Sequence, residues 1–208
     1  MDEEASEERV EADTTIPHSV NTSASNDALD AIVLSKHHFS DLGPLGSWTV
    51  SSAKPGFDIA MVQDASLDTY WQSDGPQPHH INIHFPRLVT FQYLSIYLNF
   101  GLDESYTPSS IRVMSGMGYH TLLEVQTLDF NEPTGWHHVD LTQQLGDVPA
   151  GSLFPTRLVQ LQVLANHQNG KDTHVRAIKL HSPVARSIVV EDDIAFDTEL
   201  LGDENLIR

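Results

Sequence analysis

Short segments in which apolar and polar residues alternate recur through the middle of this sequence, and they limit the folds open to it. Residues 80–85 are the clearest case, because Ile81, Ile83 and Phe85 are separated by polar residues. Successive side chains of a strand point to opposite faces, so these three apolar side chains share one face. Further segments of this kind span residues 47–51, 89–100, 111–114, 122–128, 136–141, 157–163 and 175–180. About eight or nine short strands separated by turn residues predict an all-β sandwich or barrel.

The alternation is mostly one-sided. In residues 89–100, Leu94, Ile96 and Leu98 share a face, and polar or amphipathic residues occupy the other. This pattern predicts an antiparallel sandwich whose outer face contacts water. One short helix is expected within residues 58–64. The sequence has no internal repeat, which argues against a propeller.

Charge divides the chain into three parts. The formal net charge is −18, of which residues 1–35 contribute −8 and residues 187–208 contribute −6. We therefore predict a disordered acidic tail over 1–35, a folded domain over 36–186 and a flexible acidic tail over 187–208. The domain has no basic excess, so we expect it to bind neither nucleic acid nor an anionic membrane surface.

The composition also bears on compartment. The chain has no Cys, so no disulfide framework is possible. Its first residues are acidic and unlike a signal peptide, and no apolar run approaches the roughly 20 residues that span a bilayer. These features predict a soluble intracellular protein.

Residues 164–174, between two alternating segments, carry more hydrogen-bonding groups than a connecting turn needs. The segment contains three side-chain amides, two imidazoles, a Lys and an Asp. Two interpretations stay open. The loop is either a binding surface or a polar connection whose side chains satisfy its own backbone.

The twelve His residues do not predict a metal site. His80 and His84 are four residues apart on a strand, which separates their Cα atoms by roughly 13 Å. His167 and His174 are able to approach each other around their loop, with an acidic partner from residues 103–104. This arrangement falls short of the ligand number and geometry of a structural metal site, so we expect none.

Catalysis is not predicted either. Asp103, Ser105 and His167 are the residue types of a catalytic triad, but Ser105 is not part of a Gly-x-Ser-x-Gly elbow. The chain contains neither a phosphate-binding Gly loop nor a dinucleotide fingerprint. We therefore expect no enzyme activity and no cofactor.

The aromatic residues divide into two groups. Trp48 and Trp136 lie in alternating segments, which predicts core positions. Tyr70 and Trp71 precede the polar turn 72–75. There an aromatic ring either packs the base of the loop or faces a ligand, and both alternatives stay open.

Five blocks of the sequence resemble the signature blocks of the DOC domain, in the order in which that family has them. They cover residues 52–56, 67–79, 103–109, 132–136 and 163–174. Because the chain is a lone DOC domain with short tails, it is similar to the DOC-domain subunit family (subunit ten) of the anaphase-promoting complex, or cyclosome. The resemblance implies a jelly-roll β-sandwich like galactose-binding domains.

The resemblance also implies a function. Members act as non-catalytic subunits of a cell-cycle ubiquitin ligase, in the nucleus and cytoplasm. Beside a β-propeller co-activator, such a domain is a co-receptor for destruction-box substrates and promotes processive ubiquitination. The expected partners are therefore other subunits of the complex, including a tetratricopeptide-repeat subunit, the co-activator and the substrates.

The family's ligand-facing loops correspond to three segments of this chain. The implied degron-binding residues are Trp71, Gln72, Ser73, Asp74, Asp103, Glu104, Ser105, Tyr106, Asn166, His167, Gln168, Asn169 and Asp172. The terminal residues Ile207 and Arg208 resemble the family's docking tail for the tetratricopeptide-repeat subunit. The acidic segment 191–204 departs from the family pattern and leaves the flanking contacts of the tail undefined.

A carbohydrate-binding module is the alternative function, because the implied fold family includes many of them. Such a module needs an aromatic platform beside its polar loops. The candidates in this chain are Tyr70, Trp71 and Tyr106.

Overall fold

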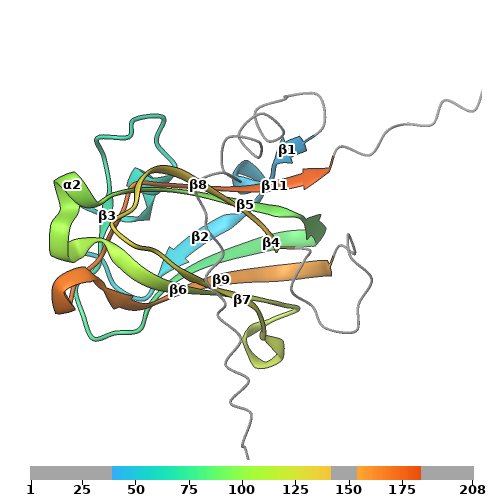
Figure 1. Ribbon diagram of the computed structural model, residues 1–208. Coiled ribbons are helices and arrows are strands. Elements are labelled where there is room, and N and C mark those ends of the chain that lie inside the picture. The colour runs from blue at the N-terminus through green and yellow to red at the C-terminus, as the bar shows by residue number, and fades with distance from the viewer. Residues whose placement is uncertain (1–38, 142–153, 184–208) are drawn as a thin grey trace, which may run out of the picture.

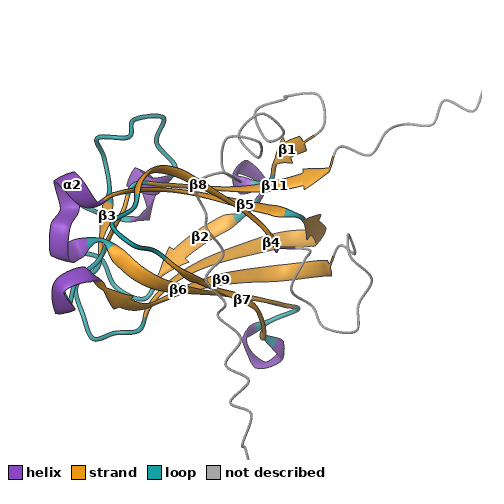
Figure 2. Ribbon diagram, in the orientation of Figure 1, coloured by secondary structure: helices purple, strands orange, loops and turns teal. Residues whose placement is uncertain are grey.

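The computed structural model describes residues 39–141 and 154–183, in which two antiparallel sheets pack face to face (Figures 1 and 2). The predicted tails fall outside these residues. One sheet has the strand order β1–β11–β5–β8 and the other β2–β4–β9–β6–β7, while β10 and β3 form a two-stranded sheet. The strands are β1 (Phe39–Asp41), β2 (Ser47–Val50), β3 (Trp71–Gln72), β4 (His79–Phe91), β5 (Tyr93–Asn99), β6 (Pro108–Gly116), β7 (Leu123–Asp129), β8 (Thr134–Asp140), β9 (Phe154–Asn166), β10 (His174–Val175) and β11 (Ala177–Pro183).

The core lies between the two large sheets and uses the faces that the alternation predicted. Ile81, Ile83 and Phe85 of β4 are at most 4% exposed. Across the core, Leu94, Ile96 and Leu98 of β5 are at most 1% exposed. The predicted β-sandwich is thus confirmed, and burial of these apolar faces is the main favourable contribution to its stability.

Helices are short and lie in the connections. The helix predicted within 58–64 is η2 (Ile59–Val62), where the Asp58 carboxylate accepts a hydrogen bond from the Ala60 N–H. A second short helix, α2 (Phe100–Asp103), was not predicted; there the Asn99 side chain accepts from the Leu102 N–H. The other helices among the described residues are η1 (Gly43–Leu45), η3 (Glu104–Tyr106), η4 (Tyr119–Thr121) and η6 (His167–Asn169). None of the helices within 39–141 and 154–183 is long and apolar enough to cross a bilayer.

Of the two tryptophans predicted in the core, one packs against it and the other does not, and Trp71, whose position was left open, is buried. Trp71 is fully buried, and its indole N–H donates to the carbonyl of Ser52 at 3.0 Å. Trp48 is half-buried and packs against the core, as predicted. Trp136 is also half-buried but lies on the outer face of its sheet, with the Lys179 ammonium 5.3 Å from its ring. Its prediction was wrong because β8 places Trp136 opposite Tyr97, on the face of β5 that points away from Ile96 and Leu98.

The outer face of the four-stranded sheet is less exposed to solvent than predicted. Ser95, on the face opposite Leu94, is 0% exposed. Its hydroxyl lies 2.6 Å from Nδ1 of His138 and 2.8 Å from Nε2 of His181. A hydroxyl between two imidazoles satisfies its hydrogen-bonding capacity without water. The centre of this face is therefore closed by side chains from three neighbouring strands.

Candidate functional site

Four connecting segments meet at one end of the sandwich, which we call the loop end. They are residues 71–77, 100–107, 130–135 and 166–174. Figure 1 shows α2 and the helix of segment 166–174 side by side there, beyond the start of β6 and the end of β9. The segments that the sequence resemblance pointed to are thus neighbours in the structure.

Segment 166–174 is fastened to the strands and loops beneath it. Ser73 and Thr173 exchange two hydrogen bonds: the Ser73 N–H donates to the Thr173 carbonyl at 3.1 Å, and the Thr173 N–H donates to Ser73 Oγ at 2.9 Å. The side-chain amide of Gln77 donates to the Gly170 carbonyl at 3.0 Å. The His79 ring lies 2.6 Å from the Lys171 carbonyl, which it bonds through Nε2. These contacts fix the loop along most of its length.

A side chain of the loop itself, that of Asn166, also bonds the loop's backbone. Nδ2 of Asn166 donates to the carbonyl of Asp172 at 2.7 Å and to that of Gly170 at 3.2 Å. This part of the loop fits the interpretation in which polar side chains satisfy the local backbone. Gln168 and Asn169 lie at the exposed tip of the loop. Their exposed side-chain amides are accessible to a ligand.

His167 joins two of the other segments. Its N–H donates to the Thr107 carbonyl at 2.9 Å, and its Nε2 accepts from the Glu132 N–H at 3.1 Å. The His167 and Phe100 rings are 5.0 Å apart. The imidazole therefore has a positioning role, and it does not meet His174, which bonds Asp103 instead. Among the described residues, no group of three or more possible ligands is arranged to hold a metal ion.

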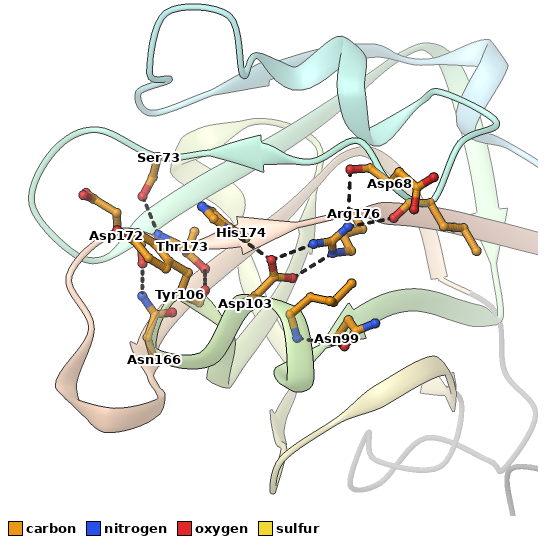
Figure 3. Close-up of polar contacts among 12 residues, drawn as sticks. Asp68, Ser73, Asn99, Asp103, Tyr106, Asn166, Asp172, Thr173, His174 and Arg176 are labelled. Atoms are coloured by element: carbon orange, nitrogen blue, oxygen red, sulfur yellow. Dashed lines mark hydrogen bonds and ion pairs between the residues drawn. The ribbon is translucent and has the colours of Figure 1, made fainter.

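A buried ion pair lies beneath these loops (Figure 3). Asp103 is 4% exposed, and its two oxygens accept hydrogen bonds of 2.8 Å from Nε and Nη2 of Arg176. The ring of His174 lies 3.0 Å from Oδ1 of the same carboxylate. Nη1 of Arg176 donates to the Leu67 carbonyl at 2.9 Å. One guanidinium thus ties together three parts of the chain that are far apart in sequence.

The ion pair keeps its charges. Burial alone raises the pKa of Asp103, but hydrogen bonds and charges from His174 and Arg176 outweigh it and hold that pKa below its ordinary value. The hydrogen bonds to Asp103 are the largest cause that raises the pKa of Arg176. Both groups are therefore ionised at neutral pH.

Four rings stack beside this pair. Tyr70 lies between Phe57 and His174, at centroid distances of 5.0 and 4.1 Å. Tyr106 covers the other face of His174 at 4.3 Å and is itself 39% exposed. Arg176 lies 5.3 Å from the Tyr70 ring. Tyr70 therefore packs the base of the loop, which settles one of the open alternatives.

Left-handed backbone conformations concentrate at the loop end. Among the described residues, the non-glycine residues with positive φ are Glu104 (45°), Glu132 (46°), Gln168 (53°) and Asn169 (58°). All four belong to the loop end. Such conformations cost energy, and they persist where the surrounding structure enforces them, often at ligand-binding sites.

The predicted degron-binding residues divide by exposure. Those at the surface are Asp74, Glu104, Tyr106, Gln168 and Asn169. Those partly exposed are Ser105, His167 and Asp172. Those buried are Trp71, Gln72, Ser73, Asp103 and Asn166. The buried residues hold the exposed ones in place, and the terminal pair Ile207 and Arg208 lies outside the described residues.

Asp103 and Glu104, both among the implied degron-binding residues, have different environments. Asp103 is buried and already paired with Arg176, whereas Glu104 is exposed. Sequence reasoning also missed Arg176 and Glu132. A cation inside an apolar alternating segment was the available signal for Arg176, and Glu132 opens the fourth matching block. The exposed acidic groups of the loop end are Asp74, Glu104 and Glu132.

The fold has close structural relatives among carbohydrate-binding modules. A family 32 module of NanJ from Clostridium perfringens, solved with galactose, superposes with a TM-score of 0.57 at 7% identity, over 69% of this chain and 99% of that one. Chitosan-binding module 1 of a chitosanase/glucanase from Paenibacillus sp. IK-5 gives 0.54 at 16% identity, over 69% of this chain and 99% of that one. At these identities the likeness shows the fold alone, and it confirms the predicted jelly-roll, galactose-binding-like sandwich.

Sequence comparison identifies a family. The model of the family "Anaphase-promoting complex, subunit 10 (APC10)" matches residues 7–205. The protein named anaphase-promoting complex subunit 10 in Schizosaccharomyces pombe is 45% identical over 171 residues, which are 82% of this chain and 88% of that protein. Its namesake in Homo sapiens is 47% identical over 151 residues, 72% of this chain and 78% of that protein. The chain therefore belongs to the subunit 10 family of the anaphase-promoting complex.

Proposed function

We propose that this chain is a non-catalytic subunit of the anaphase-promoting complex, a cell-cycle ubiquitin ligase. In that assembly its loop end acts with a β-propeller co-activator as a co-receptor for destruction-box substrates, which promotes processive ubiquitination. The first part of the proposal rests on family membership. The second rests on the geometry of the loop end.

The observation that carries the co-receptor role is a rigid base beneath an exposed polar tip. The Asp103–Arg176 pair and the Ser73–Thr173 bonds fix the loops before a ligand arrives. The exposed amides of Gln168 and Asn169 are suited to the main chain of an extended peptide. The exposed carboxylates are suited to its basic side chains through charge-assisted hydrogen bonds. Preorganisation of this kind lowers the entropic cost of binding.

A ubiquitination assay with the reconstituted complex tests the role. The double variant Gln168→Ala/Asn169→Ala removes two exposed side chains without touching the buried network. We expect it to join the complex normally and to bind a destruction-box peptide about tenfold more weakly, because it loses two hydrogen bonds of roughly 0.5–1.5 kcal/mol each. Fewer ubiquitins are then added per binding event.

His120→Ala is the matched control, since this residue is exposed and lies outside the loop end. It should leave peptide binding unchanged. If the loop variant binds the peptide and builds chains as the unmodified protein does, the degron role is wrong. If the unmodified chain does not join the complex, the proposed subunit role fails as well.

The carbohydrate-binding alternative has one observation in its favour, the likeness to sugar-binding modules. The positions of the aromatic side chains argue against carbohydrate binding. Of the three candidate platform rings, Trp71 is fully buried, Tyr70 is stacked between two rings, and Tyr106 alone is 39% exposed. Titration with galactose and with N-acetylgalactosamine distinguishes the two functions, and specific binding at the loop end would revive the alternative.

A further inference from the structure

A hollow of about 390 Å³ opens beside β11, and it shares no residue with the loop end. Its walls come from Asp41 of β1, from η1, from Trp48 of β2, from residues 62–67, from β8 and from residues 177–179 of β11. The proposed function makes no use of it. Its volume lies within the range of ligand-binding pockets.

Among the described residues, a stretch of strand edge beside the hollow has no pairing partner. Strand β1 pairs with β11 only from His181 to Pro183, and the N–H of Leu42 donates to the Leu180 carbonyl at 2.7 Å. Main-chain groups two residues apart on a strand point the same way, so the N–H and carbonyl of Ile178 face this same edge. Within the described part of the chain, no strand pairs with β11 along this edge before His181. Ile178 therefore offers one donor and one acceptor to the hollow.

The walls supply two further kinds of contact. Trp48 and Trp136, both half-buried, present indole surface. Asp41 and Asp64 are exposed; one oxygen of Asp41 accepts from the Gly43 N–H at 2.8 Å, and one of Asp64 from the Ser66 N–H at 3.4 Å. Among the described residues, nothing donates a hydrogen bond to the other oxygen of either carboxylate, which leaves it available to a cation. Lys179, held over the Trp136 ring, is the one cation among the described residues that line the hollow.

We propose that this hollow binds an extended peptide segment of a partner protein. The segment adds main-chain hydrogen bonds at Ile178, as in recognition by strand addition. Because alternate side chains of an extended peptide point to opposite sides, an apolar residue meets the indoles while a neighbouring basic residue meets the carboxylates. The open edge, the indole surface and the net negative charge select this ligand class together. The site is a second peptide-binding site, separate from the loop end.

Nuclear magnetic resonance with the ¹⁵N-labelled full chain tests the site, using acetyl-Val-Lys-Val-Lys-Val-amide as the probe. The amide signal of Ile178 and the indole signals of Trp48 and Trp136 should shift on titration. The side-chain amide signals of Gln168 and Asn169 should not shift, since they belong to the loop end. The same peptide with Glu in place of Lys should bind at least about fivefold more weakly, because it loses two exposed ion pairs.

Two variants locate the binding. Asp64→Asn keeps the bond to Ser66 and removes the charge, so the Lys peptide should bind about two- to fivefold more weakly. Ala65→Trp, at an exposed position of the hollow wall, should abolish binding while thermal unfolding stays unchanged. Asp129→Asn on β7 is the matched charge control. The proposal is overturned if the probe causes no shifts, if shifts fall only at the loop end, or if Ala65→Trp binds normally.

Discussion

Gly170 lies where segment 166–174 packs against the backbone of the 100–107 segment. A Cβ atom built on Gly170 would lie 1.7 Å from the Ser105 carbonyl oxygen, so the two backbones cannot keep their spacing around a larger residue. We expect Gly170→Ala to destabilise the protein by about 1–3 kcal/mol, as overpacking does, and to displace the loop. Urea unfolding measures the first effect and destruction-box binding the second. Gly118→Ala is the control, because nothing lies within 4 Å of its Cβ position.

Asp103 is the second residue whose substitution should destabilise the whole loop end. Asp103→Ala leaves the Arg176 guanidinium, 5% exposed, without its carboxylate. Breaking a buried pair by removing one partner costs about 3–5 kcal/mol, so a large drop in the urea midpoint is expected. Asp129→Ala, which removes an exposed carboxylate bonded to Ser110, should cost under about 1 kcal/mol. Equal effects of the two substitutions would show that the Arg176 pair does not hold the loops.

At the scale of elements, periodicity was a reliable guide only where strands were long enough to show it. β4 and β5 were found with the predicted inner faces, Ile81 to Phe85 and Leu94 to Leu98. β1, β3 and β10 have two or three residues, too few for any alternation to be read. For this reason the sequence left open whether Trp71 is buried or faces a ligand.

The loop end was predictable to a lesser degree. Residue types indicated that segment 166–174 has more polar side chains than a turn needs. The family resemblance then indicated which other loops lie beside it. The side chains that hold the loops could not be foreseen, because their partners are distant in sequence: Asp103 and Arg176 are separated by 73 residues. A carboxylate in a loop is usually solvated, and only the fold brings a guanidinium beneath this one. Propensity carries no information on such long-range pairs.

The strands that carry buried imidazoles should make the domain sensitive to acid. Burial is the main reason that the pKa values of His80 on β4, His137 on β8 and His181 on β11 lie below their ordinary value of 6.5. Below pH 6.5 the unfolded chain therefore binds protons that the folded chain does not, so the free energy of unfolding falls as the pH drops from 6.5 toward the folded-state values. Above pH 6.5 these groups add no pH dependence.

Urea midpoints measured between pH 5 and 8 check this expectation. His181→Gln, which keeps a hydrogen-bonding side chain and removes the titrating group, should flatten the profile in part. His120→Gln, at an exposed position, should leave it unchanged. A midpoint that stays constant down to pH 5 in the unmodified protein would contradict the burial argument.

At the scale of the whole molecule, we propose that substrate contact and docking belong to different parts of the chain. The loop end carries the exposed amides and carboxylates, whereas the terminal Ile207 and Arg208 resemble the family's docking tail, and we propose that they dock to a tetratricopeptide-repeat subunit. If the loop end and the terminus act independently, a change in one should not weaken the binding made by the other. Distant sites with no shared partners usually have additive effects.

Deletion of Ile207 and Arg208 tests this separation. Burial of one Ile side chain contributes about 1.5–3 kcal/mol, so the truncated chain should join the complex at least about tenfold more weakly. At saturating concentration it should still add to destruction-box binding, because its loop end is intact. Gln168→Ala/Asn169→Ala should show the reverse pattern, and Asn205→Ala serves as the control within the tail. Full incorporation of the truncated chain would refute the assignment of the terminus, and a joint loss of both activities in either variant would refute their independence.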